Sequence, residues 1–122
     1  MTTLVRRNYS IGIYVLWFAQ IAAAGMFFVA GGSKLAGVPA MVQLFDAIGI
    51  GQWFRYLTGT IEVVSAILLL MPSLAIFGAL ALTATMVGAI FTHLFIVGGN
   101  PGVPIVLLAT TTAIAWARRS EL

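Results

Sequence analysis

The sequence predicts an all-α, polytopic membrane protein: a bundle of four transmembrane helices with a short amphipathic helix between the first two spans. The chain of 122 residues is 61% hydrophobic and only 7% charged, and its mean hydropathy is +1.10. An average soluble domain carries about 25% charged residues, so this chain has too few charges to cover a surface that faces water. The length leaves room for four spans and little else, and we therefore expect residues 1–122 to form a single domain.

Four apolar stretches of spanning length follow one another along the chain. They cover about residues 11–30, 52–71, 73–97 and 101–117, and the turn signals "GGSKLAGVP", "MPS" and "GGNPG" separate them. The fourth stretch is near the lower limit of the ~17–25 residues that cross a hydrocarbon core. The first begins like a signal peptide, but its apolar run continues past "AAAG", so we expect it to be retained as a span.

The connection between the first two spans is long for a helical hairpin, so we expect it to hold an element of its own. Pro39 suits the first turn of a helix, and Gln43 and Asp46 fall on one side of that helix. Apolar residues recur at helical spacing on the other side: Met41, Leu44, Phe45 and Ile48. This pattern predicts a short amphipathic helix that lies at the outer interface or folds over the mouth of the bundle.

The charges that flank the spans indicate an orientation and exclude some functions. Arg6 and Arg7 precede the first span, and Arg118 and Arg119 follow the last. Basic flanks favour the cytoplasmic side and contacts with anionic lipid, and an even number of spans puts both termini on one side. We therefore expect a protein of the bacterial cell (inner) membrane, surrounded by the lipid bilayer, with cytoplasmic termini and no nucleic-acid partner. The chain has no cysteine, which excludes disulfides, thiolate metal sites and dithiol redox chemistry.

Glu62 is the most informative residue of the chain, because it lies inside the otherwise apolar run "LTGTIEVVSAILLL". It falls some ten residues into its span, about 15 Å along the helix axis, which is near mid-depth. An ionised carboxylate is costly there unless it is paired or neutralised. Lys34 or Arg55 could supply the compensating charge, and an intramembrane acid is a candidate for function.

The other polar residues of the spans have simpler interpretations when each is taken alone. Gln20 could form a hydrogen bond to a neighbouring helix, Lys34 could extend to the headgroups, and His93 could be a structural donor. Helical spacing nevertheless puts these residues on three stripes, which are Gln20, Phe27, Gly31 and Lys34; Arg55, Gly59, Glu62, Ala66 and Leu69; and Gly78, Ala81, Thr85, Ala89 and His93. We expect the stripes to bring an amine, an acid and an imidazole to one buried polar or ligand-binding site beneath the outer loops, formed by Lys34, Glu62, His93, Gln20 and Arg55.

These motifs resemble those of the DoxX-like family of small four-helix integral membrane proteins. The similar segments are "GMFFVAGGSKLAG", "GTIEVVSAILLLMP" and "ATMVGAIFTH", and the similarity covers about residues 11–117. The resemblance implies a connection with quinone-linked oxidation of sulfur compounds or with oxidative-stress complexes, although wider relatives resemble assembly factors. It carries Lys34, Glu62 and His93 over as the positions of interest, and it assigns no reaction to them.

Three functional hypotheses follow. The first is a component of a membrane redox system that binds a quinone or another apolar ligand, where a lysine or imidazole stabilises the ligand oxygen and Glu62 relays a proton. One histidine and no cysteine cannot hold haem, iron–sulfur or copper. The chain would therefore be at most a subunit of a quinone-linked oxidoreductase, without metal or covalently bound cofactor, and would need a redox partner protein.

The second hypothesis is a non-enzymatic assembly factor or scaffold, in which the same polar residues fix the helix register. The third is a small proton-coupled transporter that works through Glu62 as a homo-oligomer. A ridge of small residues in the fourth span could form the contact between copies: Ala109, Ala113 and Ala117.

Overall fold

The computed structural model describes the backbone of residues 3–121 and the side chains of residues 12–120, and within this part every regular element is helical. The elements are α1 (Thr3–Ala36), α2 (Pro39–Ile48), α3 (Trp53–Leu69), α4 (Ala75–Thr92), the π-helical turn η1 (His93–Val97), α5 (Gly102–Ala117) and the 3-10 turn η2 (Arg119–Glu121). The predicted all-α class is confirmed for these residues.

Two helical segments are long and apolar enough to cross a membrane, namely Gly12–Ala36 in α1 and Ala75–Val97 in α4 with η1. The other two predicted spans correspond to α3, with 17 residues, and α5, with 16. The membrane character of the chain is therefore supported by two spans, and the full set of four stays a prediction.

The amphipathic helix expected between the first two spans is present as α2. It begins at Pro39, whose ring suits the first turn, and ends at Ile48. Gly49 terminates it with a left-handed backbone (φ 89°), and its N–H donates to the Phe45 carbonyl over 3.2 Å. Phe45 is the buried residue of this helix.

The helix of the first predicted span continues past residue 30, because α1 ends only at Ala36. The twin glycine Gly31–Gly32 lies inside the helix instead of forming a turn. Gly31 is a packing residue there: a Cβ on it would lie 2.8 Å from the Gly59 carbonyl oxygen of α3. The missing side chain lets the two backbones approach each other closely.

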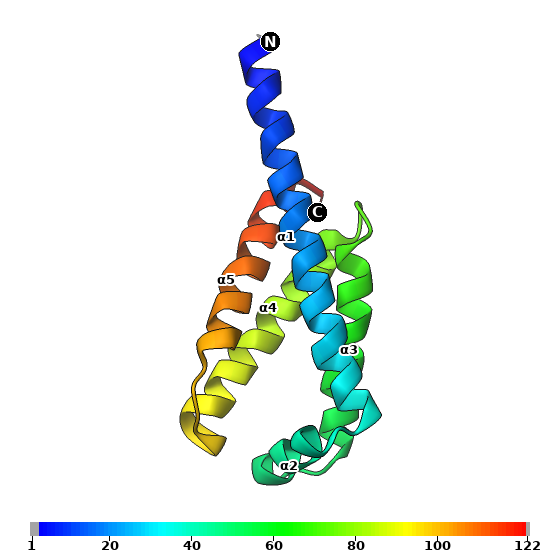
Figure 1. Cartoon of the computed structure of the whole chain (residues 1–122), viewed down its shortest axis with the longest axis vertical. Helices are drawn as coiled ribbons and strands as arrows, with labels where there is room; N and C mark the ends of the chain where they lie inside the picture. The colour runs from blue at the N-terminus through cyan, green and yellow to red at the C-terminus, as the bar shows by residue number, and fades with distance from the viewer. Residues whose placement is uncertain (1–2, 122) are drawn as a thin grey trace.

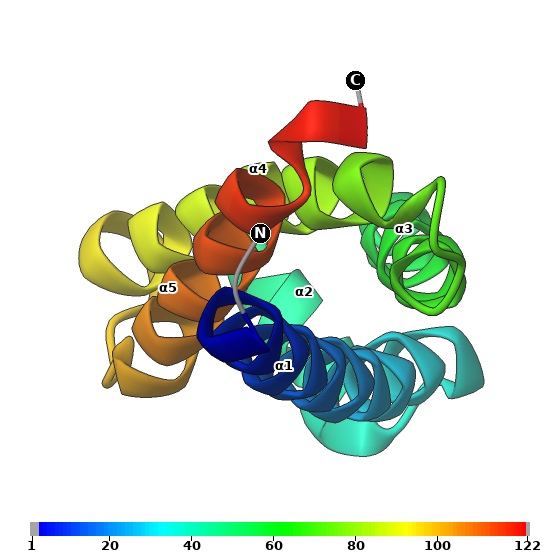
Figure 2. The ribbon, with the colours of Figure 1, turned by 90° about the horizontal axis from the view of Figure 1, so that it is seen from above.

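The helices pack as neighbours in the order α1–α3, α3–α4 and α4–α5, with a smaller contact between α1 and α5. The first part of α1, the α3–α4 turn and the end of α5 lie towards one end of the molecule (Figure 1). From there α1 with α3 and α4 with α5 diverge, and α2 lies across the wide end, as the view from above also shows (Figures 1 and 2).

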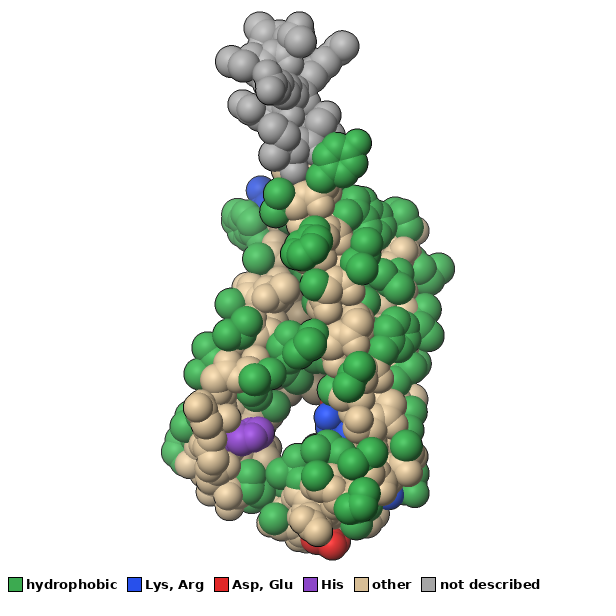
Figure 3. All heavy atoms as spheres, in the orientation of Figure 1, with side chains coloured by type: hydrophobic (Ala, Val, Ile, Leu, Met, Phe, Trp, Pro, Cys, Tyr) green, Lys and Arg blue, Asp and Glu red, His purple; other side chains and the backbone are tan. Residues whose placement is uncertain are grey.

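A tightly packed core holds the four long helices together where they converge. Its fully buried members include Phe27 of α1, Leu69 of α3, Leu82 of α4 and Ile114 of α5. Large apolar side chains such as Phe18 and Phe95 are about three-quarters exposed, at 76% and 73%. Apolar side chains cover much of the outer surface in Figure 3, which suits a protein surrounded by lipid.

Candidate functional site

A cavity of about 790 Å³ lies between the diverging helices and beneath α2. Its walls come from α1, α2, α3, α4, η1 and α5, and most of the lining side chains are apolar. The space-filling view shows an opening on this side, with the histidine on one edge and a basic side chain on the other (Figure 3). The volume falls within the ~300–1,000 Å³ that is typical of small-molecule sites.

Lys34 and Glu62 form an ion pair in the cavity wall. The Lys34 Nζ lies 2.8 Å from Glu62 Oε1, and the side chains are 16% and 2% exposed. The second carboxylate oxygen, Oε2, is buried without a hydrogen-bond partner among the described residues. Of the two cations that the sequence offers as partners for the acid, the ion pair forms with Lys34.

The two glycines at the α1–α3 crossing position this ion pair. Lys34 follows Gly31 by three residues, and Glu62 follows Gly59 by three, so each charged residue lies one turn beyond a glycine. A Cβ on Gly59 would lie 3.0 Å from the Lys34 Cβ, and one on Gly31 would lie 3.1 Å from the Glu62 Cβ. The close approach of the two helices therefore holds the amine against the acid.

Arg55 lies outside the cavity and supports the end of α1. Its Nη1 donates to the Lys34 carbonyl oxygen, and its Nε donates to Gln52 Oε1 over 2.7 Å. Gln52 Nε2 in turn donates to Asp46 Oδ1 on α2, over 2.8 Å. These contacts connect the last turn of α1 with α2 and the start of α3, next to Lys34.

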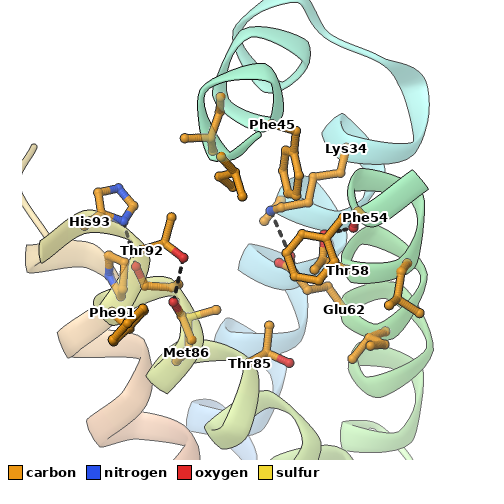
Figure 4. A pocket seen from close by; sticks show the side chains of 18 of the residues that line it. Lys34, Phe45, Phe54, Thr58, Glu62, Thr85, Met86, Phe91, Thr92 and His93 are labelled. Carbon is orange, nitrogen blue, oxygen red and sulfur yellow. Dashed lines mark hydrogen bonds and ion pairs between the residues drawn. The ribbon is translucent and has the colours of Figure 1, made fainter. Parts of the chain in front are cut away.

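His93 faces the cavity from the other side, at the first residue of η1 (Figure 4). Its Nδ1 lies 2.9 Å from the Ala89 carbonyl oxygen. A carbonyl oxygen only accepts, so Nδ1 carries the proton of this hydrogen bond, and a neutral ring then presents Nε2 as an acceptor. No hydrogen bond or ion pair between described residues joins His93 to Lys34 or Glu62. Single π-helical turns such as η1 occur frequently at functional sites.

Gln20 lies elsewhere, at the convergent end of the bundle, where it forms a buried clamp with Arg118. Its Nε2 donates to the Leu69 carbonyl over 2.7 Å, and its Oε1 accepts from Arg118 Nη2 and Nε at 2.7 and 3.0 Å. The guanidinium also lies over the ring of Trp17, 5.1 Å from its centroid. The sequence grouped Gln20 with the cavity residues and treated Arg118 as a topology signal, whereas the structure joins these two to each other.

Threonine hydroxyls complete the polar lining of the cavity. Thr58, Thr85 and Thr92 line it, and each donates to a carbonyl of its own helix, at 2.9, 2.8 and 2.8 Å. Thr85 belongs to one of the stripes predicted from the sequence, whereas Thr58 and Thr92, which lie four residues before Glu62 and one before His93, do not. Among the described residues there is no group of three His, Asp or Glu side chains that could hold a metal ion.

Comparison with known proteins gives one family and one curated relative. The model of the DoxX-like family matches residues 18–117. The protein named "Putative oxidoreductase CatD" from Bacillus subtilis (strain 168) is 26% identical over 88 residues, which are 72% of this chain. The match spans 63% of that relative, which is less than two thirds of its length. No solved structure matches the chain significantly.

Proposed function

This chain belongs to the DoxX-like family, and we propose that it is a component of a membrane redox system that holds a quinone or a similar apolar ligand in the cavity beneath α2. The observation that carries the proposal is the buried ion pair of Lys34 and Glu62 in the wall of a largely apolar cavity of about 790 Å³. The name of the Bacillus relative, an oxidoreductase, is consistent with this role.

The arrangement of these groups suits the chemistry of a quinone. A quinone carbonyl gains negative charge and takes up protons when it is reduced, and the Lys34 ammonium can stabilise that charge in a site with little water. Glu62 contacts the Lys34 ammonium and also lines the cavity. Its carboxylate can therefore carry a proton between the ammonium and a ligand in the cavity. The apolar remainder of the lining accommodates the ring and its tail.

Electrons reach such a ligand from another protein. The sequence contains one histidine and no cysteine, so it lacks the ligand sets of haem, iron–sulfur and copper centres. The chain therefore acts at most as the quinone-binding subunit of an oxidoreductase, without a covalently bound cofactor of its own. A redox partner protein completes the system, and the small-residue ridge on α5 is available for a homo-oligomer.

The proposal includes four spans in a bacterial inner membrane with both termini in the cytoplasm. Packing of α3 and α5 along α1 and α4 supports it, since all four long helices run between the same two ends (Figure 1). The arginines near both termini favour the cytoplasm for the convergent end. The cavity and α2 then belong to the outer half of the membrane.

A pair of glycine substitutions tests the proposal without changing any charge. Gly88 lines the cavity, and a Cβ on it would meet nothing within 4 Å; Gly25 of α1 also has open space but does not line the cavity. We expect Gly88→Phe to place a ring in the cavity and to weaken the binding of decylubiquinone to the purified protein, measured by equilibrium titration. Gly25→Phe, which points a ring towards lipid, should bind as the wild type does. Equal binding by the two variants, or binding of neither decylubiquinone nor its reduced form by the wild type, contradicts the proposal.

A scaffold or assembly factor is the second candidate, and the clamp of Gln20 and Arg118 favours it. That clamp joins α1, α3 and the end of α5 and makes no contact with the cavity, so at least one buried polar group of this chain has a structural purpose. Proton-coupled transport receives no such support, because the apolar core around Phe27 and Leu82 separates the cavity from the convergent end.

A further inference from the structure

The polar atoms that line the cavity are mostly acceptors, and this imbalance bears on the ligand. We propose that the cavity selects the reduced, hydroxyl-bearing form of its ligand, a lipophilic hydroquinone, over the corresponding quinone. This inference rests on the proposed function and adds to it the redox state that the site prefers.

The first acceptor is Glu62 Oε2, which is buried and has no donor among the described residues. A quinone oxygen only accepts, so in this corner it could face Lys34 but would leave Oε2 without a partner and bring two acceptors together. A phenolic hydroxyl can donate to Oε2 and accept from the Lys34 ammonium at once. Leaving a buried acceptor unpaired costs more than a hydrogen bond gains, so the hydroxyl fits better.

The second acceptor is His93 Nε2, on the opposite side of the cavity (Figure 4). The hydrogen bond from Nδ1 to the Ala89 carbonyl oxygen uses the single ring proton that an uncharged imidazole carries. In that form Nε2 can accept a hydrogen bond from a second hydroxyl, and the two hydroxyls of a hydroquinone leave its ring at opposite ends. A quinone offers His93 no donor.

The threonines of the lining add no hydrogen-bond donors for a ligand. The hydroxyl protons of Thr58, Thr85 and Thr92 are all directed to backbone carbonyls of the preceding turn. Each threonine oxygen can then only accept from a ligand. Within the described lining, Lys34 is thus the side chain with donors left for the ligand, while acceptors are present at Glu62, His93 and all three threonines.

The test compares three probes of nearly equal size in anaerobic titrations of the full-length protein: decylubiquinol, decylubiquinone and the dimethyl ether of decylubiquinol. We expect the quinol to bind about tenfold tighter or more, because at least one buried acceptor changes from unpaired to paired. The dimethyl ether, which lacks O–H groups, should bind no tighter than the quinone. A tenfold preference also raises the midpoint potential of the bound couple by about 30 mV, since the couple transfers two electrons.

Two variants separate the acceptors. Glu62→Gln keeps the size of the side chain but adds an N–H donor, and His93→Phe removes the acceptor on the other wall; each should reduce the preference for the quinol. If Glu62→Gln does not fold, His93→Phe still tests the proposal. Equal or tighter binding of the quinone by the wild type overturns the inference and leaves the proposed function intact, whereas binding of none of the probes overturns both.

Discussion

Lys34 and Glu62 are the residues whose chemistry depends most on each other. The acid is 2% exposed and the amine 16%, so neither charge has enough water to be stable alone. The pairing gives each an opposite charge at 2.8 Å, and the glycines behind them make the distance possible. Replacing either residue therefore leaves the other without its partner, and this loss should lower the free energy of unfolding.

Glu62→Leu with Lys34 intact should lower the free energy of unfolding by about 2–3 kcal/mol, because it leaves a partly buried ammonium without its counter-charge. The loss is smaller than for a fully buried pair, since Lys34 retains some exposure. The double variant Lys34→Met with Glu62→Leu should regain most of this stability. Thermal unfolding in mild detergent measures both, and an unchanged midpoint for the single variant would mean that Lys34 reaches water.

Gly31 and Gly32 provide a second residue-level test, because they are adjacent but face different surroundings. A Cβ on Gly31 would lie 2.8 Å from both the Gly59 carbonyl oxygen and Val63 Cγ2, whereas one on Gly32 meets nothing within 4 Å. Gly31→Ala should destabilise the fold by about 1–3 kcal/mol through overpacking. Gly32→Ala should be neutral or stabilising by up to about 1 kcal/mol, since alanine favours a helix. Thermal unfolding in mild detergent measures the stability of both variants. A similar loss of stability for Gly31→Ala and Gly32→Ala would contradict the close crossing of α1 and α3.

At the level of single residues, the sequence identifies Glu62 well and Gln20 poorly. An acid in an apolar run is expensive wherever the helices pack, so its need for a partner is visible without a structure. The partner of Gln20 is 98 residues away, and helical spacing alone does not say which end of a span meets which. The adjacent Arg118 and Arg119 are alike in sequence, yet only Arg118 is buried.

Among the elements, α2 forms the wall of the cavity at the wide end of the molecule (Figure 1). It is a short helix between two turns that contain glycines of positive φ, Gly37 and Gly49, and it contacts α1, α3 and η1 less extensively than the long helices contact each other. Its buried residue, Phe45, packs edge-on against Phe54 with the ring centroids 5.9 Å apart. Both rings line the cavity, so this contact closes the cavity on the side of α2.

Phe45→Ala should speed the release of a bound ligand about tenfold, because it removes the aromatic contact that holds α2 over the cavity. Stopped-flow fluorescence with decylubiquinol as the probe measures the dissociation rate. Gln43→Ala is the matched control, since Gln43 is exposed on the same helix and should leave the rate unchanged. Equal rates for the two variants would show that α2 does not limit release.

Hydropathy and proline chemistry predict most of the elements to within a few residues. Pro39 and the apolar spacing give α2 correctly, and the third and fourth apolar stretches coincide with α4–η1 and α5. The end of α1 could not be predicted in this way, because glycine is common both in turns and at close helix crossings. Only the neighbouring helix decides between these two uses of Gly31.

For the whole molecule, the divergence of the helix pairs is what creates the cavity. The closely packed core lies at the convergent end, while the wide end is spanned by α2 (Figure 1). Hydrophobicity along the chain gives the number and length of helices but not the angles at which they cross. Those angles depend on small contacts such as the one at Gly78, where a Cβ would lie 2.6 Å from the Ser65 carbonyl oxygen. The size and the walls of the cavity therefore could not be predicted from the sequence, although a site beneath the outer loops that contains Lys34 and Glu62 could.

The chain has no native cysteine, so single-cysteine variants can test the topology of the whole molecule. Ser73→Cys and Ser120→Cys lie at the convergent end, and Ala40→Cys and Asn100→Cys lie at the wide end; all four positions are exposed. With the convergent end in the cytoplasm, a membrane-impermeant maleimide should label the second pair in intact cells and the first pair only after permeabilisation. The opposite pattern would invert the orientation, and labelling of one residue from each pair would contradict four spans.

The clamp between Gln20 and Arg118 also constrains how the protein is made. Ninety-eight positions separate the two residues, so the ribosome has already delivered the first helix to the bilayer long before the guanidinium emerges. During that interval the amide oxygen of Gln20 lacks the two hydrogen bonds that Arg118 donates to it in the folded protein. A nascent chain interrupted before Arg118 thus keeps an unpaired polar group in its first helix, so the clamp forms only when synthesis of the last helix is complete.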